Sequence, residues 1–494
     1  MKEPIVLPVP GSPLHAALTR RAFFGRSAGG MGIAALAFLL GRRSASAEAS
    51  LESGIAGGAS RGLPGLPHFA PRARRVIHLF MSGGPSQIDL LDPKPKLVEL
   101  NGKPMPESFT KGQRVAQLMG QELRCIGSKF RFEKRGKCGA DISELLPHTA
   151  RIVDEIAIIR SMHTDAINHD PAVTLFQTGG QQPGRPSIGA WASYGLGCDT
   201  DQLPAFVVLT SGRGLDQPLV ARYWGSGFLP SSYQGVEFRS EGEPILFVDN
   251  PRGMDRSKRR RMLDGLGELN RLKLRSVADP EIETRIQAFE MAFRMQGSVP
   301  ELMDLEKEPP AVLERYGAVP GGSDSFANNC LLARRLVERG VRFVQLYHRG
   351  WDQHGNLPAE LTRQCLATDR ACAALIEDLK ERGLLDDTLV VWTGEFGRTP
   401  MNQGDTSNGN YGRDHHMKAF ATWLAGGGIR GGITIGETDE LGYNPIADPV
   451  HINDLQATVL HCLGVDHEKL TYRFQGRDFR LTDVGGVVVE KLLG

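Results

Sequence analysis

The chain is poor in cysteine, with seven among its 494 residues. An odd number at this low density excludes a disulfide-stabilised scaffold. No Cys-x-x-Cys pair is present, which excludes the commonest thiolate zinc site. Cys125 and Cys138 flank a basic, strand-like segment, and a disulfide between them after export is left open.

The chain also has almost no net charge. Its formal charge is +1, so no overall electrostatic attraction to nucleic acid or to an anionic membrane is expected. Hydrophobic residues make up 40% and charged residues 23%, as in a soluble globular protein with room for one large α/β domain or two smaller ones. The 59 glycines and 30 prolines predict many loops. No long low-complexity tract occurs beyond the N-terminus, so we expect long loops at an active face and not disorder.

The N-terminus has the features of an export signal. Residues 19–24 resemble the twin-arginine motif, and an apolar stretch at 29–40 and an Ala-Ser-Ala cleavage site at 45–47 follow. We therefore predict a signal peptide over 1–47, a flexible leader over 48–74 and a periplasmic or extracellular protein. The apolar stretch is too short for a stable membrane span after processing. The alternatives are an uncleaved tether or a chance arginine pair.

Apolar runs that alternate with helical patterns predict an α/β fold. Near-continuous apolar strands are typical of a parallel sheet covered on both faces. We expect this sheet in one domain over residues 75–485, with a helical insertion at about 251–316, where charge and helix formers increase. The basic run 256–261 inside it is interpreted as a solvated helical face and not as a binding patch. The predicted strands cover residues 75–81, 156–159, 203–209, 341–347, 388–393 and 419–424, and the predicted helices include 142–152, 171–178, 186–194, 328–339, 358–382 and 451–460.

Histidines and carboxylates gather where these strands end. The carboxyl ends of parallel strands share one edge, so loops that are distant in sequence can converge there. A single Asp or His in a loop is more often a solvated or capping residue, but several such groups at strand ends predict a metal site. Imidazole and carboxylate are ligands for a divalent metal such as zinc, iron or manganese. The candidate ligands are Asp89, His169, Asp352, His354, Glu395, His415 and His416.

Four motifs resemble the alkaline phosphatase and sulfatase superfamily. The resemblance covers residues 75–481 and implies a three-layer α/β sandwich with a mostly parallel central sheet. Residues 169–179 resemble the helix that begins at the sulfatase nucleophile, and residues 352–354 resemble an Asp/His pair that binds metal. Residues 390–397 resemble a metal-binding motif that follows a strand, and residues 454–460 resemble the start of a helix near the C-terminus. The closer resemblance is to an exported family, domain of unknown function 1501, through residues 82–89, 169–172, 351–354, 394–398 and 412–416.

The departures from the sulfatase pattern change the expected chemistry. His169 occupies the nucleophile position, Val173 replaces the arginine and Phe396 replaces a second metal ligand. Without Cys or Ser at that position, no formylglycine can form. His169 could itself accept a phosphoryl group, or it could join the ligands of a metal that makes a bound water nucleophilic. We favour the second interpretation because other histidines are numerous nearby.

The expected activity is metal-dependent hydrolysis of a phosphate or sulfate ester. Arg398 or Arg413 would hold the anionic group, or else form salt bridges that order the loops. Asp170 or His163 would act as general acid or base. The predicted partner is a small-molecule or glycan anionic ester and not nucleic acid; the oligomeric state is not predicted.

Two alternatives to this activity remain open. The first is a catalytically degenerate member of the superfamily that binds an anionic ligand, a glycan or a partner protein without turnover. The second is a sulfatase in a shifted register, for which Ser161 and Ser86 are the only nearby hydroxyl candidates.

Overall fold

A computed structural model describes most of the chain from residue 62 onward. The described residues are 62–494 apart from 114, 213–218, 240–243, 246–249, 252, 278, 323–324 and 405–408. They belong to one compact unit, residues 59–494. The predicted signal peptide over 1–47 and the first part of the predicted leader lie outside the described residues.

A mixed sheet of nine strands forms the centre of the described structure. Its strand order is β12-β4-β11-β8-β1-β7-β5-β6, and β15 pairs beside β4. All neighbouring strands pair in parallel except at β11, which runs antiparallel to both β4 and β8. The predicted α/β fold with a mostly parallel sheet is therefore confirmed. The strands are β1 (Arg75–Met81), β4 (Ile156–His163), β5 (Phe206–Ser211), β6 (Val236–Phe238), β7 (Phe343–His348), β8 (Thr388–Thr393), β11 (Phe420–Ala425), β12 (Ile433–Ile435) and β15 (Val450–His451).

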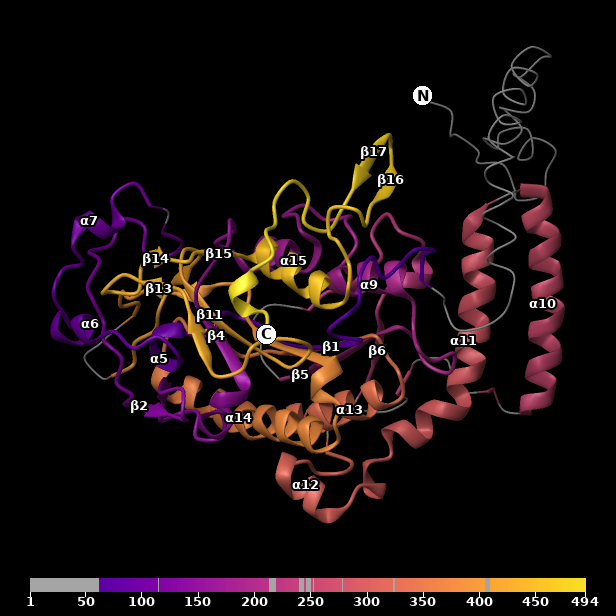
Figure 1. Ribbon diagram of the computed structural model, residues 1–494, viewed down its shortest axis with the longest axis horizontal. Helices are drawn as coiled ribbons and strands as arrows, with labels where there is room; N and C mark the ends of the chain where they lie inside the picture. Colours follow the sequence, from indigo (N-terminus) through magenta and orange to yellow (C-terminus); the bar gives the residue numbers. More distant parts are fainter. Residues whose placement is uncertain are drawn as a thin grey trace, which may run out of the picture. The chain divides into compact units, whose positions relative to one another are not determined.

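Helices cover both faces of the sheet (Figure 1). Successive side chains of a strand point to opposite faces, so one strand supplies two cores. On β1, Val76 and Phe80 join the core beneath α8, α9 and α15, whereas Ile77 and Leu79 join the core beneath α13 and α14. These helices are α8 (His169–Thr178), α9 (Ile188–Leu196), α13 (Phe326–Glu338), α14 (Leu357–Glu381) and α15 (Ile452–Cys462).

Further helices lie within the range assigned to a helical insertion. They are α10 (Arg256–Val277), α11 (Pro280–Met303) and α12 (Pro310–Tyr316). Helix α10 packs mainly on α11, which in turn contacts α13. No helix among the described residues is both long enough and apolar enough to cross a membrane.

Three local predictions differ from the structure. Residues 62–74, predicted as flexible leader, are bound to the domain: the Leu63 amide donates to the Gly195 carbonyl, and the Ala73 amide donates to the Cys462 carbonyl. Residues 142–152, predicted as a helix, contain the end of β3 (Ala140–Ser143) and one 3-10 turn (Thr149–Arg151). All seven cysteines are free, so the Cys125–Cys138 disulfide is not formed.

Candidate metal centre

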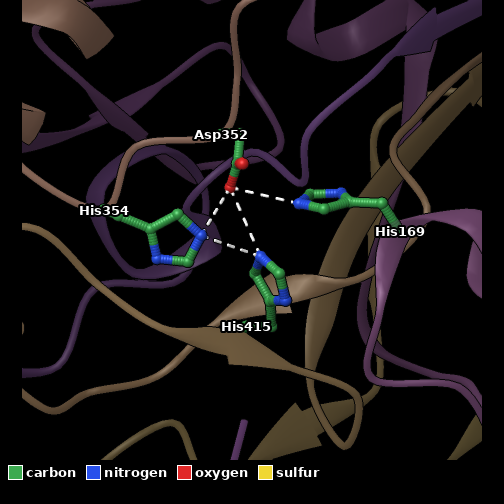
Figure 2. Close-up of side chains that lie close together, drawn as sticks. All are labelled: His169, Asp352, His354 and His415. Atoms are coloured by element: carbon green, nitrogen blue, oxygen red, sulfur yellow. Dashed lines mark hydrogen bonds and ion pairs between the residues drawn. The ribbon is translucent and has the colours of Figure 1, made fainter. Parts of the chain in front are cut away.

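Four side chains converge at one edge of the sheet: His169, Asp352, His354 and His415 (Figure 2). One potential ligand atom from each lies within 4.8 Å of all the others. Oδ1 of Asp352 is at the middle, 3.2 Å from Nε2 of His169, 2.8 Å from Nε2 of His354 and 3.3 Å from Nε2 of His415. The two Nε2 atoms of His354 and His415 are 2.9 Å apart.

The sheet brings these residues together from three separate segments. His169 is the first residue of α8, after the loop that leaves the carboxyl end of β4. Asp352 and His354 lie in the loop after β7. His415 belongs to β10 (His415–His416), which pairs antiparallel with β9 (Gly397–Arg398) and precedes β11. Because β11 is reversed, its amino end reaches the edge where β4, β7 and β8 end.

The second ring nitrogen of each histidine is already occupied. Nδ1 of His169 lies 2.7 Å from Oε1 of Glu395, Nδ1 of His354 lies 2.6 Å from Oε1 of Gln403, and Nδ1 of His415 lies 2.9 Å from the Ile167 carbonyl oxygen. All three partners are oxygen acceptors, so each Nδ1 carries the proton and donates it. In the neutral rings, the Nε2 lone pairs are therefore left facing the cluster.

This donor set fits a divalent cation. Nε2 of His169 is buried and faces Oδ1 of Asp352 at 3.2 Å, without the geometry of a regular hydrogen bond. Two unprotonated imidazole nitrogens at 2.9 Å repel each other and the nearby carboxylate unless a metal ion or a proton lies between them. Three imidazoles and one carboxylate suit zinc and related metals, and a hydrogen bond from the far ring nitrogen to an oxygen acceptor is the usual support of a metal-bound histidine. The coarse prediction of a possible metal site is thus supported by the arrangement of the ring nitrogens.

Burial and close contacts shift the pKa values of Asp352, His415 and His169. Burial by itself would raise the pKa of Asp352, but hydrogen bonds with His169, His354 and His415 hold it well below its usual range. Burial lowers the pKa of His415 to about 4, so its ring is neutral near pH 7. Burial also disfavours protonated His169, but its hydrogen bonds with Asp352 and Glu395 outweigh burial and raise the pKa. Metal binding at Nε2 of His169 therefore competes with protonation of this ring.

Arg398 is an internal partner of this cluster. Its Nη2 donates to Oδ1 of Asp352 at 2.7 Å, its Nε donates to the Gly84 carbonyl at 2.9 Å, and its Nη1 donates to the Arg413 carbonyl at 3.0 Å. The side chain is buried, and its donors are directed at the protein. It therefore helps to keep Asp352 ionised and does not present a free guanidinium to an anionic substrate, which agrees with the alternative of a salt bridge that orders the loops.

Three predicted metal ligands lie outside the group of four. Glu395 is behind His169 and also accepts the Gly83 amide at 2.9 Å, so it orients the ring and is not among the converging donors. His416 follows His415 in a strand, so its side chain points the opposite way. It lies with Nε2 2.6 Å from the Tyr443 carbonyl oxygen.

Asp89 is the third of these, and it pairs with Arg413. Nε of Arg413 donates to Asp89 at 2.8 Å, and both side chains are completely buried. Nη1 of the same arginine donates to the carbonyls of Ile126 and Thr399. Arg413 thus orders the loops, as the alternative interpretation held, and is not free to hold a substrate anion.

The two residues predicted as general acid or base also lie elsewhere. Asp170 follows His169 on α8, about a quarter turn around the helix, and forms an exposed ion pair with Arg222 while accepting the Tyr223 hydroxyl at 2.6 Å. His163 lies beside His451, with ring centroids 5.2 Å apart. Neither residue belongs to the group of four.

The two serine hydroxyls considered for a shifted register are also engaged. Ser161 donates to the Asp448 carbonyl and Ser86 donates to Asp89. Neither hydroxyl is available as the nucleophile of a sulfatase in a shifted register.

Several contributors to the site were not predicted from the sequence. The side chain of Gln403 and the Ile167 carbonyl orient two of the rings, but no local pattern distinguishes them. Gly83, which belongs to the 82–89 motif, comes so close to Asp352 that a Cβ atom would lie 2.4 Å from the Asp352 nitrogen. This close approach places the Gly83 amide against Glu395.

A cavity of ≈ 480 Å³ lies next to the cluster. Ile167 lines it and gives its carbonyl to His415. Leu118 also lines it, and its neighbour Gln117 reaches to 3.4 Å from Nε2 of His354. The cavity has the size of a small-molecule site. Its lining is largely apolar: Gln113, Val115, Leu118, Met119, Gly120, Gln121, Leu123 and Ile167.

Comparison with known proteins identifies one matching family, described as a protein of unknown function (DUF1501), over residues 73–493. Among curated protein sequences, none matches. Similar solved structures include the alkaline phosphatase of the Antarctic bacterium TAB5, with 12% identity, a TM-score of 0.29, and coverage of 75% of this chain and 96% of that one. The PsFucS1 sulfatase from Pseudoalteromonas sp. has 12% identity, a TM-score of 0.32, and coverage of 80% and 69%. The lipoteichoic acid synthase LtaP from Listeria monocytogenes has 9% identity, a TM-score of 0.33, and coverage of 86% and 78%.

Proposed function

The chain belongs to the DUF1501 family, and from this premise we propose that it is an exported, metal-dependent hydrolase of phosphate or sulfate esters. The observation that carries the proposal is the convergence of three Nε2 atoms and one carboxylate oxygen, with every Nδ1 held by an oxygen acceptor. Export by the twin-arginine route is part of the proposal and rests on residues 19–47 alone.

His169, Asp352, His354 and His415 would hold the metal. A divalent ion bound there supplies positive charge to the ester oxygens and makes water more acidic. Glu395 fixes the orientation of His169, and Arg398 stabilises the ionised form of Asp352. Two carboxylates against one guanidinium leave a local deficit of positive charge, which favours cation binding.

The nucleophile in this scheme comes from water. Among the described residues, no serine or cysteine belongs to the group of four, and the hydroxyls of Ser86 and Ser161 are engaged elsewhere. His354 is the most exposed member, at 23%, so solvent and substrate would approach on its side. The adjacent apolar cavity would receive the organic part of the ester, which favours an aryl or alkyl group over a polar sugar.

A second candidate function is metal-dependent binding of an anionic ligand, a glycan or a partner protein without turnover. One specific observation favours it: Arg398 and Arg413, the arginines expected to hold a substrate anion, make their hydrogen bonds inside the protein. A site without a free anion-binding side chain relies on the metal alone for that task.

Metal content and turnover measured together separate these functions. We would purify the protein and determine zinc, iron and manganese by mass spectrometry. Hydrolysis of 4-nitrophenyl phosphate and 4-nitrophenyl sulfate would then be assayed. The hydrolase proposal expects about one metal per chain, with metal and turnover both lost in His354→Ala and both kept in His68→Ala, a substitution at an exposed histidine. Stoichiometric metal without hydrolysis of any ester would favour the binding function, and absence of metal would contradict both.

A further inference from the structure

Helix α10 has an exposed apolar stripe that no described element covers. Met262, Leu266, Leu269 and Leu272 follow one another at helical spacing and lie on one side of the helix. All four are exposed, Leu269 by 63% and Leu272 by 61%. The side of α10 that packs on α11 is not the side of the stripe. It carries the buried residues Leu263 and Gly267, and Arg260, which pairs with Glu290 of α11.

The same helix has a strong excess of positive charge. Its 22 residues include eight lysines and arginines but only Asp264 and Glu268 as acids. The whole chain has a net charge of only +1, so the remainder is net negative and the positive charge is concentrated here. Lys258 and Lys273 lie on the side of the stripe, before and after it. Arg261, Lys273 and Arg275 are exposed, and no ion-pair partner is found for them among the described residues.

We propose that α10 binds the surface of an anionic membrane, so that the basic run 256–261, interpreted from the sequence as a solvated face, is part of a binding surface. A helix with an apolar stripe, flanking lysines and arginines and a low overall hydrophobicity lies in the plane of a membrane interface. The lysines and arginines would contact lipid phosphates while the leucines enter the boundary between headgroups and acyl chains. The molecule would be held peripherally, by this one helix.

Charge argues against two other occupants. Two copies of α10 facing each other would bring like charges together, which disfavours self-association through this stripe. Nucleic acid would satisfy the cations, but it would leave the leucines exposed to solvent. An anionic lipid surface satisfies both the charges and the apolar side chains.

Sedimentation with vesicles tests the proposal. Full-length protein would be mixed with phosphatidylcholine vesicles that either contain or lack phosphatidylglycerol, at low and at high salt. We expect binding only with phosphatidylglycerol, and weaker binding at high salt. Lys258→Gln/Arg261→Gln/Lys273→Gln should lower the affinity on the order of a hundredfold, and Leu269→Gln/Leu272→Gln about tenfold or more.

The matched control is Val484→Gln/Val487→Gln, which alters two exposed valines elsewhere and should bind as the wild type does. All variants share one N-terminus, so differences among them report on α10. Thermal unfolding midpoints near the wild-type value show that each variant is folded.

Equal binding by the leucine variant and the wild type would overturn the proposal, as would failure of the wild type to bind phosphatidylglycerol vesicles. A dimer by light scattering that the leucine variant abolishes would instead identify a second copy as the partner, and tighter binding to duplex DNA than to vesicles would identify nucleic acid.

Discussion

The Nε2 atoms of His354 and His415 lie 2.9 Å apart, while the Nδ1 atom of each ring lies within 2.9 Å of an oxygen acceptor. When both rings are neutral and protonated at Nδ1, the two Nε2 lone pairs point at each other, and neither nitrogen has a proton to donate to the other. A metal ion bound to both Nε2 atoms, or an added proton on one of them, relieves this arrangement. This relationship gives the metal proposal its most direct tests.

Replacing each of the two neighbouring histidines of β10 should affect metal content differently. His415→Ala removes an Nε2 donor from the cluster, so we expect most of the bound metal to be lost. His416→Ala removes a ring that lies against the Tyr443 carbonyl on the other side of the strand, so metal content should stay close to one per chain. Mass spectrometry of both purified variants measures this. Loss of metal in both, with His416→Ala folded by circular dichroism, would contradict the placement.

Glu395→Gln should weaken metal binding without abolishing it. The amide still meets Nδ1 of His169 but lacks the charge that raises the basicity of the ring. Losing such a supporting carboxylate lowers metal affinity by roughly 10- to 100-fold. Competition with a fluorescent chelator gives the affinity, and saturating metal should restore full stoichiometry. If no metal binds at any concentration, Glu395 is a direct ligand, as was predicted from the sequence.

Asp89→Asn should destabilise the fold far more than Asp170→Asn. The first leaves Arg413 charged and completely buried without its acid, a loss of about 3–5 kcal/mol. The second breaks an exposed pair with Arg222 and costs about 0–1 kcal/mol. The free energy of unfolding in urea measures both changes. Equal losses would mean that burial of the Asp89–Arg413 pair contributes nothing to stability.

Stability should fall as the pH drops below about 6.5, the unfolded-state value for histidine. Burial lowers the pKa of His78 to about 3 and that of His348 to about 4 in the folded protein. Between those values and 6.5, the unfolded chain binds more protons, so acid favours unfolding. Each group contributes a loss of about 2 kcal/mol between pH 7 and pH 5.

Urea unfolding of the metal-free protein at several pH values checks this dependence. His78→Phe, placed among Phe80, Phe176 and Phe343, should flatten the slope of stability against pH. His68→Phe, at an exposed position, should leave the slope unchanged. A steeper slope in His78→Phe would contradict the assignment.

Much of the fold could be read from local patterns. Apolar runs predicted six strands of the sheet, because a strand buried on both faces needs apolar side chains throughout. Pro171 in the first turn and Gly179 after the last residue of α8 marked that helix, because proline tolerates the first turn and glycine adopts the left-handed conformation, here with φ +71°. The family resemblance also came from short motifs and is confirmed over residues 73–493.

The choice among the candidate ligands was decided by long-range pairing. Seven histidines and acids were predicted as ligands near strand ends, and four of them converge. One reason is that β11 runs antiparallel to its neighbours, which brings the preceding segment to the same edge of the sheet. The other is that successive side chains of a strand point to opposite sides, so His415 faces the cluster and His416 faces away. Asp89 and Arg413, 324 positions apart, are joined in a buried ion pair that no local pattern encodes. Sequence by itself determined which residue types stand at the ends of the strands. Only the tertiary structure decided which of them meet, because strand order and direction depend on contacts between distant segments.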